Sequence, residues 1–353
     1  MTTDLVLTLT AGPDNPRNSE GAFITLRNGN ILFAYSRYTG ESWSDHATAD
    51  IAARCSTDRG QTWSTDDRLL VANEGQCNVM SVSLLRLHDG RIALFYVQKN
   101  SGVDCRLRLR TSSDEGGTWS DAVIGNPGSG YFVTNNDRVI QLASGRLLAP
   151  AAYHRPKTAD SDLGAGIANQ GEAVFFVSDD AGQSWRETTT RLRVGQEIHS
   201  GLQEPGVIER RGGSLYGWAR TSEGRQWEFT STDGGETWTE PSPSTFRSPT
   251  SPLSLKAITP DPIWLAVWND RETPGHRRIR IRSGFELGPH PTRPRHESRR
   301  GRHVVNASTD RGRPAAGLLL HRDSLRRRRS PARLLLRRAR NRRAPEHLPP
   351  SSE

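Results

Sequence analysis

The chain has 353 residues and a formal net charge of +9, but residue 271 onward holds 23 arginines against 7 acidic residues, which leaves the first 270 residues at −7. Its three cysteines are a sparse, odd-numbered set without metal-ligand spacing, and this pattern favours a reducing compartment. No apolar run is long enough to span a membrane, and the start MTTDLVLTLT lacks the features of a secretory signal, so we expect a cytoplasmic protein with no membrane partner, metal or cofactor.

Along the chain, the predicted elements recur as strand, tight turn, strand, longer loop, strand, second turn and strand. The tight turns contain glycine, separate two apolar runs, and lie at Asn28-Gly29, Asp89-Gly90, Ser144-Gly145 and Gly212-Gly213. Two-residue turns of this kind close β-hairpins. Four antiparallel strands in each repeat predict the blade of a β-propeller.

The second turn of each repeat carries the pattern Ser-x-Asp-x-Gly-x-x-Trp. Its four copies are Ser56 to Trp63, Ser112 to Trp119, Ser178 to Trp185 and Ser231 to Trp238, at spacings of 56, 66 and 53 residues. The Asp can accept hydrogen bonds from backbone N–H groups ahead of it, and the Gly supplies a positive φ. The Trp is expected to bury its ring against the blade that it follows. Four copies predict one repeat architecture rather than several unrelated domains.

This pattern resembles the Asp-box, or bacterial neuraminidase repeat, of the sialidase superfamily, over residues 1 to about 270. The resemblance implies an all-β fold, a six-bladed β-propeller of sialidase type. In that family the box is a structural turn, so Asp58, Asp114, Asp180 and Asp233 are expected to be structural. The implied activity is that of an exo-α-sialidase-like glycoside hydrolase, with a terminal sialic acid or related acidic sugar as substrate.

The repeat changes character in its fifth copy. A hairpin begins at Ile258 to Asp270, but no complete box follows it, so the last blades are expected to be incomplete. The sequence therefore divides into a propeller over residues 1–277, with four intact blades and part of a fifth, and an Arg/Pro-rich tail over residues 278–353.

Three hypotheses compete for this tail: a basic arm for nucleic acid, a disordered extension, and an out-of-frame translation of the missing blades. The composition changes abruptly inside a repeat rather than at a linker, which favours the frame error. The tail also lacks the aromatic platforms typical of nucleic-acid binding, so we do not expect nucleic acid as a partner.

Alternation of antiparallel strands places one set of polar residues on a single face, which we call the mouth. The mouth contains the start of the first strand of each repeat, the end of its second strand and the loop that follows the second strand. Polar side chains concentrate there, as expected of a binding site. They are Arg17 to Glu20, Arg37, Asp45, Asn78, Gln98, Lys99, Asn136, Asp137, His154, His199, Glu204 and Arg220.

The resemblance assigns roles to five of these residues. Asp45, in the loop after the second strand, is expected to be the general acid/base, and Glu204 to activate a tyrosine nucleophile. Arg17 and Arg220 are expected to grip the substrate carboxylate, and Arg37 to contact the sugar ring near the acid. Glu204 and Arg220 are 16 residues apart, so a hairpin brings both to the mouth.

Other assignments stay open. Asp50 is the alternative candidate for the general acid/base, but it adjoins a strand and is expected to end it. His46 is interpreted as a loop residue without a role. The family uses a neutral Tyr because a substrate carboxylate repels an anionic nucleophile, yet none of the six tyrosines lies at the family's position, and the third arginine is not identified. The alternative function is a non-catalytic glycan- or protein-binding propeller, which needs no tyrosine.

Overall fold

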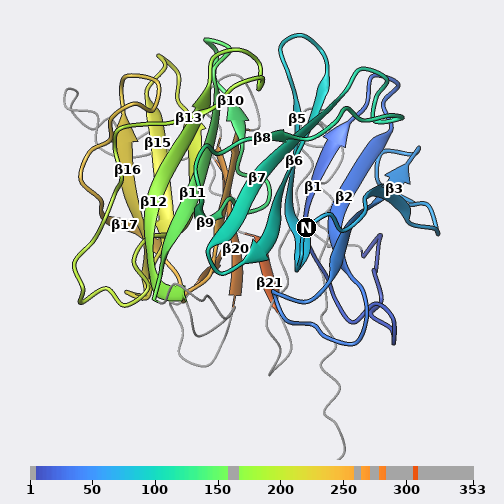
Figure 1. Cartoon of the computed structure of the whole chain (residues 1–353), viewed down its shortest axis with the longest axis horizontal. Coiled ribbons are helices and arrows are strands. Elements are labelled where there is room, and N and C mark those ends of the chain that lie inside the picture. Colours follow the sequence, from blue (N-terminus) through green and yellow to red (C-terminus); the bar gives the residue numbers. More distant parts are fainter. Residues whose placement is uncertain (1–4, 158–166, 258–263, 271–277, 284–304, 309–353) are drawn as a thin grey trace, which may run out of the picture.

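The computed structural model describes residues 5–157, 167–257, 264–270, 278–283 and 305–308. Within these ranges the chain forms 21 strands and no helix, in four sheets (Figure 1). The all-β prediction is therefore confirmed. No helix long and apolar enough to cross a membrane is present in the described part of the chain.

The first and third sheets each have four antiparallel strands in chain order, as the repeat predicts. Blade one, the blue end of Figure 1, consists of β1 (Asn18–Thr25), β2 (Ile31–Tyr38), β3 (Ala49–Ser56) and β4 (Arg68–Val71). Blade four consists of β14 (Gln203–Glu209), β15 (Leu215–Arg220), β16 (Arg225–Ser231) and β17 (Ser242–Arg247).

Blades two and three are joined in one nine-stranded sheet. Blade two consists of β5 (Asn78–Arg86), β6 (Ile92–Ser101), β7 (Asp104–Ser112) and β8 (Val123–Ile124). Blade three consists of β9 (Gly130–Val133), β10 (Ile140–Gln141), β11 (Leu147–Pro156), β12 (Ile167–Ser178) and β13 (Arg186–Glu187).

The joining strand is β9, because the inner strand of blade three is split into β9 and β10. β9 pairs in parallel with β7, where Cys105 faces Tyr131, and antiparallel with β11, where Phe132 faces Tyr153. This split places Tyr131 next to the strands of blade two.

Blade five is a further four-stranded sheet and extends past residue 277. It consists of β18 (Leu253–Ala257), β19 (Trp264–Asp270), β20 (Arg278–Ser283) and β21 (Val305–Ser308). β20 and β21 come from the segment that composition assigned to the tail, so the backbone pairing of blade five continues beyond that boundary. Residues 284–304 and 309–353, which hold most of the arginine-rich segment, lie outside the described residues. The described sheets do not close into a ring of six blades, in agreement with incomplete last blades.

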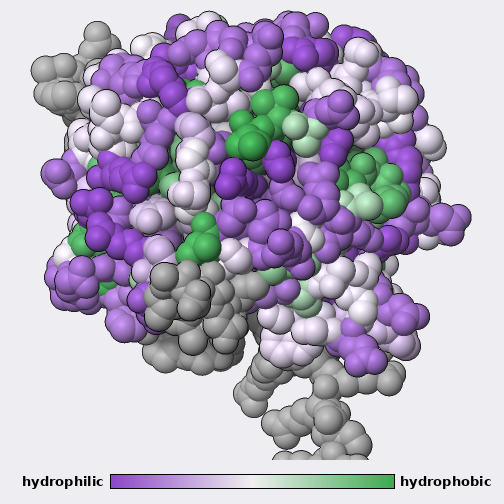
Figure 2. Space-filling view, viewed as in Figure 1, coloured by the Kyte–Doolittle hydropathy of each residue, from purple (hydrophilic) through white to green (hydrophobic). Residues whose placement is uncertain are grey.

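The hydrophobic core lies between neighbouring blades. Ile51 of blade one packs in one cluster with Val82 and Tyr96 of blade two. Trp218 of blade four shares another cluster with Trp264 of blade five. Each blade thus buries its apolar faces against the next one, whereas the surface seen in Figure 2 is mainly hydrophilic.

The two repeated turns have the local structure that their residues favour. Gly29 and Gly90 adopt positive φ values of 85° and 90° at the hairpin tips. In the fourth box, the carboxylate of Asp233 accepts hydrogen bonds from the Ser231 hydroxyl (2.8 Å) and from the Thr237 backbone N–H (3.0 Å). The carboxylate therefore holds the turn together from within.

The box tryptophans reach beyond their own blades. Trp238 meets Phe229 of blade four edge-on at 5.3 Å, but it also stacks on Phe175 of blade three, with ring centroids 4.3 Å apart. Trp185 of blade three likewise contacts Phe95 of blade two at 6.0 Å. The expectation that each Trp packs on a single blade is thus incomplete, because these rings connect adjacent blades.

Candidate active site

A recurring backbone irregularity positions the polar residues of the inner strands. The register of β1, β5 and β14 shifts beside Glu20, Ser81 and Glu204, and these residues have positive φ values of 51°, 61° and 48°. Asp137, in the gap between β9 and β10, has a φ of 58°. A non-glycine residue rarely adopts this conformation, and a β-bulge re-aims the side chain that it carries. A positive φ at a non-glycine residue of the inner strand region therefore recurs in four successive blades, and in three of them it accompanies a register shift.

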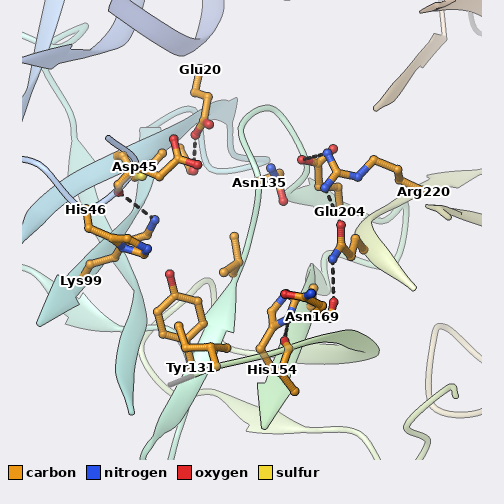
Figure 3. A pocket seen from close by; sticks show the side chains of 17 residues that line it. Glu20, Asp45, His46, Lys99, Tyr131, Asn135, His154, Asn169, Glu204 and Arg220 are labelled. Atoms are coloured by element: carbon orange, nitrogen blue, oxygen red, sulfur yellow. Dashed lines mark hydrogen bonds and ion pairs between the residues drawn. The ribbon is translucent and has the colours of Figure 1, made fainter. Parts of the chain in front are cut away.

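These blades surround a cleft of about 340 Å³ (Figure 3). Its walls come from segments up to 200 positions apart in the sequence. They are Glu20, Asp45, His46, Met80, Ser81, Lys99, Tyr131, Val133, Asn135, Ala152, His154, Ile167, Ala168, Asn169, Gln203, Glu204 and Arg220. The cleft thus brings together Asp45, Glu204 and Arg220, three of the five predicted site residues.

Asp45 lies at the edge of the cleft with its side chain 60% exposed. The Arg17 guanidinium donates a hydrogen bond to its carboxylate, and Asn78 and Lys99 donate to its backbone carbonyl at 2.9 and 3.2 Å. Partial desolvation raises the pKa of Asp45, but the hydrogen bond and charge of Arg17, with smaller effects of Lys99 and His46, lower it overall. Asp45 is therefore held as a carboxylate, and Arg17, although not in the cleft wall, acts on the site through it.

Glu20 is the second carboxyl group on this side of the cleft. Its side chain is 22% exposed, accepts a hydrogen bond from the Ser81 hydroxyl, and lies 3.8 Å from the Arg17 guanidinium. Burial raises the pKa of Glu20 and outweighs the opposite effects of Ser81, Lys99 and Arg17. The environments of Glu20 and Asp45 thus move two neighbouring pKa values in opposite directions, an arrangement that separates a proton donor from a proton acceptor.

Glu204 and Arg220 form the opposite wall, as Figure 3 shows. Nη1 of Arg220 lies 2.9 Å from Oε1 of Glu204, and Nη2 donates to the side chain of Gln203. Oε2 of Glu204 is buried and has no hydrogen-bond partner among the described residues. The hairpin spacing of 16 residues therefore brings the two side chains into direct contact.

Arg37 is not part of the cleft wall. It lies at the C-terminal end of β2, where its guanidinium pairs with Asp50 at 3.2 Å and with Asp67 at 3.4 Å. These two carboxylates hold Arg37 within blade one, so the structure does not bring it together with the other predicted residues. Asp50, the rival of Asp45, is the partner of this arginine.

Sequence reasoning gave no role to several residues that line the cleft. Tyr131 is 5% exposed, and its hydroxyl faces the open middle of the cleft in Figure 3. Burial raises the pKa of this phenol, so it stays neutral. The Tyr131 ring meets the ring of His154 edge-on at 6.2 Å. The Nδ1–H of His154 donates to the Ala168 carbonyl (2.9 Å), which leaves Nε2 with the lone pair in the neutral ring.

His46, interpreted above as a residue without a role, also lines the cleft. Its Nδ1 is buried without a hydrogen-bond partner in the described part of the chain, and burial lowers its pKa. Glu20 and Lys99 were placed on the mouth without a function. The signal that could have singled out Glu20 is its match to Glu204, since each lies near the start of the first strand of a blade, in NSEGAF and LQEPGV.

No three His, Cys, Asp or Glu side chains within the described ranges are arranged to hold a metal ion. The chemistry that this cleft offers is that of carboxyl groups, guanidinium groups, an ammonium, imidazoles and a phenol.

Comparison with known proteins relates this chain to a family. The model of the BNR repeat-like domain matches residues 35–313, most of the chain. The anhydrosialidase of Macrobdella decora is 30% identical over 158 residues, which make up 41% of this chain and 18% of that protein. The chain thus spans less than one fifth of the length of this relative.

Solved structures with low sequence identity share the fold. The leech intramolecular trans-sialidase has a TM-score of 0.63 at 16% identity and covers 91% of this chain and 65% of its own. The intramolecular trans-sialidase of Ruminococcus gnavus has a TM-score of 0.62 at 16% identity, over 89% of both chains. A Dyadobacter fermentans protein of unknown function has a TM-score of 0.60 at 19% identity, over 78% of this chain and 81% of that one. These likenesses confirm the propeller fold of sialidase type.

Proposed function

The chain belongs to the BNR repeat-like domain family, and we propose that it is an exo-α-sialidase-like glycoside hydrolase that acts on a terminal sialic acid or a related acidic sugar. The observation that carries the proposal is the convergence of Asp45, Glu204 and Arg220 on one cleft, from blades one and four. The anhydrosialidase relative and the fold neighbours that bind sialic-acid-type ligands support the choice of sugar.

The two carboxyl groups beside Arg17 would share the acid and base work. Asp45 is the predicted general acid/base; Arg17 holds it as a carboxylate in the free protein, the form that accepts a proton. Glu20 keeps its proton to higher pH and is suited to protonate the leaving oxygen. The cleft would thus have a proton donor, Glu20, and a proton acceptor, Asp45, beside the guanidinium of Arg17.

The nucleophile would be Tyr131, which comes from blade three rather than from the family's usual position. Its oxygen would bond to the anomeric carbon while the bond from that carbon to the leaving oxygen breaks, and the leaving oxygen would take the proton of Glu20. The phenol proton would pass to the carboxylate of Asp45. Water would then attack the same carbon and give its proton to the Glu20 carboxylate, while the bond to the Tyr131 oxygen breaks and that oxygen takes its proton back from Asp45. A neutral phenol suits a substrate whose own carboxylate repels an anion.

A second candidate function is a propeller that binds an acidic glycan without cleaving it. One observation favours it: Arg17, Arg37 and Arg220 are each already paired with a carboxylate of the protein. An incoming carboxylate would have to compete with these partners for the guanidinium groups.

One pair of measurements separates the two candidates. An aryl α-sialoside with a fluorescent leaving group is incubated with the whole chain, and binding of free sialic acid is measured by calorimetry in parallel. Turnover that Asp45→Asn lowers by about 100-fold or more supports the hydrolase. Binding without turnover supports the binding propeller, and neither binding nor turnover contradicts both.

A further inference from the structure

Lys99 is a buried cation in the wall of the cleft. It lies in β6, is 4% exposed, and its Nζ donates a hydrogen bond to the backbone carbonyl of Asp45 at 3.2 Å. The ammonium also stands 6.0 Å from the ring centre of Tyr131. An ammonium has three N–H donors, and this one has a single acceptor among the described residues. Hydrogen-bonding capacity is therefore left over inside the cleft.

Among the residues that the structure describes, the charge of Lys99 has no counter-ion at contact distance. No carboxylate of the described residues forms an ion pair with it, whereas Arg17, Arg37 and Arg220 are all paired. A buried ammonium without a carboxylate is unfavourable unless something else provides the negative charge. Lys99 is thus the cation of the cleft wall that is best placed to receive an anion from outside.

The surroundings of Lys99 also suit an anionic group. Figure 3 shows Lys99 beside His46 on the wall below Asp45, with the Tyr131 hydroxyl facing the same open space. Nδ1 of His46 is buried and has no partner in the described part of the chain, so it offers a further hydrogen-bonding group. Three groups of different residues therefore border one empty volume.

We propose that Lys99 binds the anionic group of the substrate, a sugar carboxylate, with His46 and the Tyr131 hydroxyl as neighbouring contacts. The carboxylate would then sit against blade two, and the arginines would keep their internal partners and hold Asp45 and Glu204 in place. This inference rests on the proposed function in taking an acidic sugar as the ligand, but it concerns binding and does not require turnover.

The test compares an acid with its neutral ester. Binding of sialic acid and of sialic acid methyl ester to the whole chain is measured by calorimetry for the unmodified protein, Lys99→Met and Lys99→Arg. The matched control is Arg186→Met, which removes a half-exposed cation of β13 that pairs with Glu236 and takes no part in the cleft wall.

We expect the unmodified protein and Arg186→Met to bind the acid at least about ten-fold more tightly than the ester, and Lys99→Met to lose this preference. Lys99→Arg keeps the charge and is expected to keep part of the preference. Equal weakening of acid and ester in Lys99→Met would overturn the inference, because it would mean that Lys99 only supports the loop of Asp45. Equal or undetectable binding of both ligands by the unmodified protein would overturn it as well. A Lys99-dependent preference without any hydrolysis would leave this inference standing and refute the hydrolase.

Discussion

Arg17 donates a hydrogen bond to the carboxylate of Asp45, 28 positions later in the chain, and the same guanidinium lies 3.8 Å from Glu20. One cation therefore stands beside two carboxyl groups whose environments differ. Arg17 bonds Asp45 directly and lowers its pKa, whereas burial dominates at Glu20 and raises its pKa. Because the pKa of Asp45 is lowered and that of Glu20 is raised, Asp45 is suited to accept a proton and Glu20 to donate one.

Replacing Arg17 is expected to shift the acidic limb of the pH–activity profile. The base form of Asp45 is lost as pH falls through its depressed pKa, and Arg17 is the main cause of the depression. Arg17→Met should therefore move the acidic limb to higher pH and lower activity most below neutrality. The profile of kcat/KM between pH 3 and 9 checks this. An unchanged acidic limb would show that Asp45 does not act as the base.

Glu20 is expected to control the alkaline limb. A donor must be protonated, and the protonated fraction of Glu20 falls as pH rises through its raised pKa, so activity should fall in the same window. Glu20→Gln should lose about 100-fold or more of kcat at pH values below this window, and its remaining activity should lack the alkaline limb.

The Ser81 hydroxyl provides a finer test of the same group. Its hydrogen bond lowers the pKa of Glu20, so Ser81→Ala should raise that pKa further and extend the alkaline limb to higher pH. An alkaline limb that moves the other way, or not at all, would rule out Glu20 as the titrating group.

Removing the Tyr131 hydroxyl is expected to stop turnover while the cleft stays folded. Tyr131→Phe keeps the ring that packs beside His154 and should reduce kcat by about 100-fold or more. The control is Tyr153→Phe, because Tyr153 packs against Phe132 in the same sheet but does not line the cleft. Full activity of Tyr131→Phe would exclude Tyr131 as nucleophile.

The fourth box is expected to contribute to acid stability. Partial burial alone would raise the pKa of Asp233, but hydrogen bonds from Thr237 and Ser231 lower it from 3.8 to about 2. This stabilisation is present above the unfolded pKa and is lost as pH falls from about 4 to about 2. Asp233→Asn should therefore lower Tm at pH 7 by about 2–4 °C and flatten the fall of Tm across that window. Parallel Tm curves for the two proteins would contradict the structural role of this carboxylate.

The repeat pattern predicted much of this architecture because its turns are local. Glycines with positive φ close the hairpins, and period-two alternation then determines which strand ends share a face. Asp45, Glu204 and Arg220 could be assigned to one site on this basis, since each lies at a strand end or in the following loop.

Residues whose place in the cleft depends on broken strand regularity could not be given a catalytic role. Glu20 faces the cleft through a bulge with positive φ, and Tyr131 reaches it because the inner strand of blade three is split. Strand alternation predicts that Arg37 lies at the mouth, but its guanidinium pairs with Asp50 and Asp67 within blade one. Such ion pairs depend on the tertiary structure, so alternation along the sequence does not predict them. The change of composition near residue 277 carries no information on the pairing of β20 with β21 in blade five.

The most direct test of the cleft as a glycosidase site is the release of sugar from 3′-sialyllactose, followed by NMR with the whole chain and with Asp45→Asn. The unmodified protein is expected to release a sialic-acid product together with lactose, and Asp45→Asn is expected to lower the rate by about 100-fold or more while it still binds free sialic acid. Equal rates in the two proteins, or no release by the unmodified protein although it binds the sugar, would contradict this expectation.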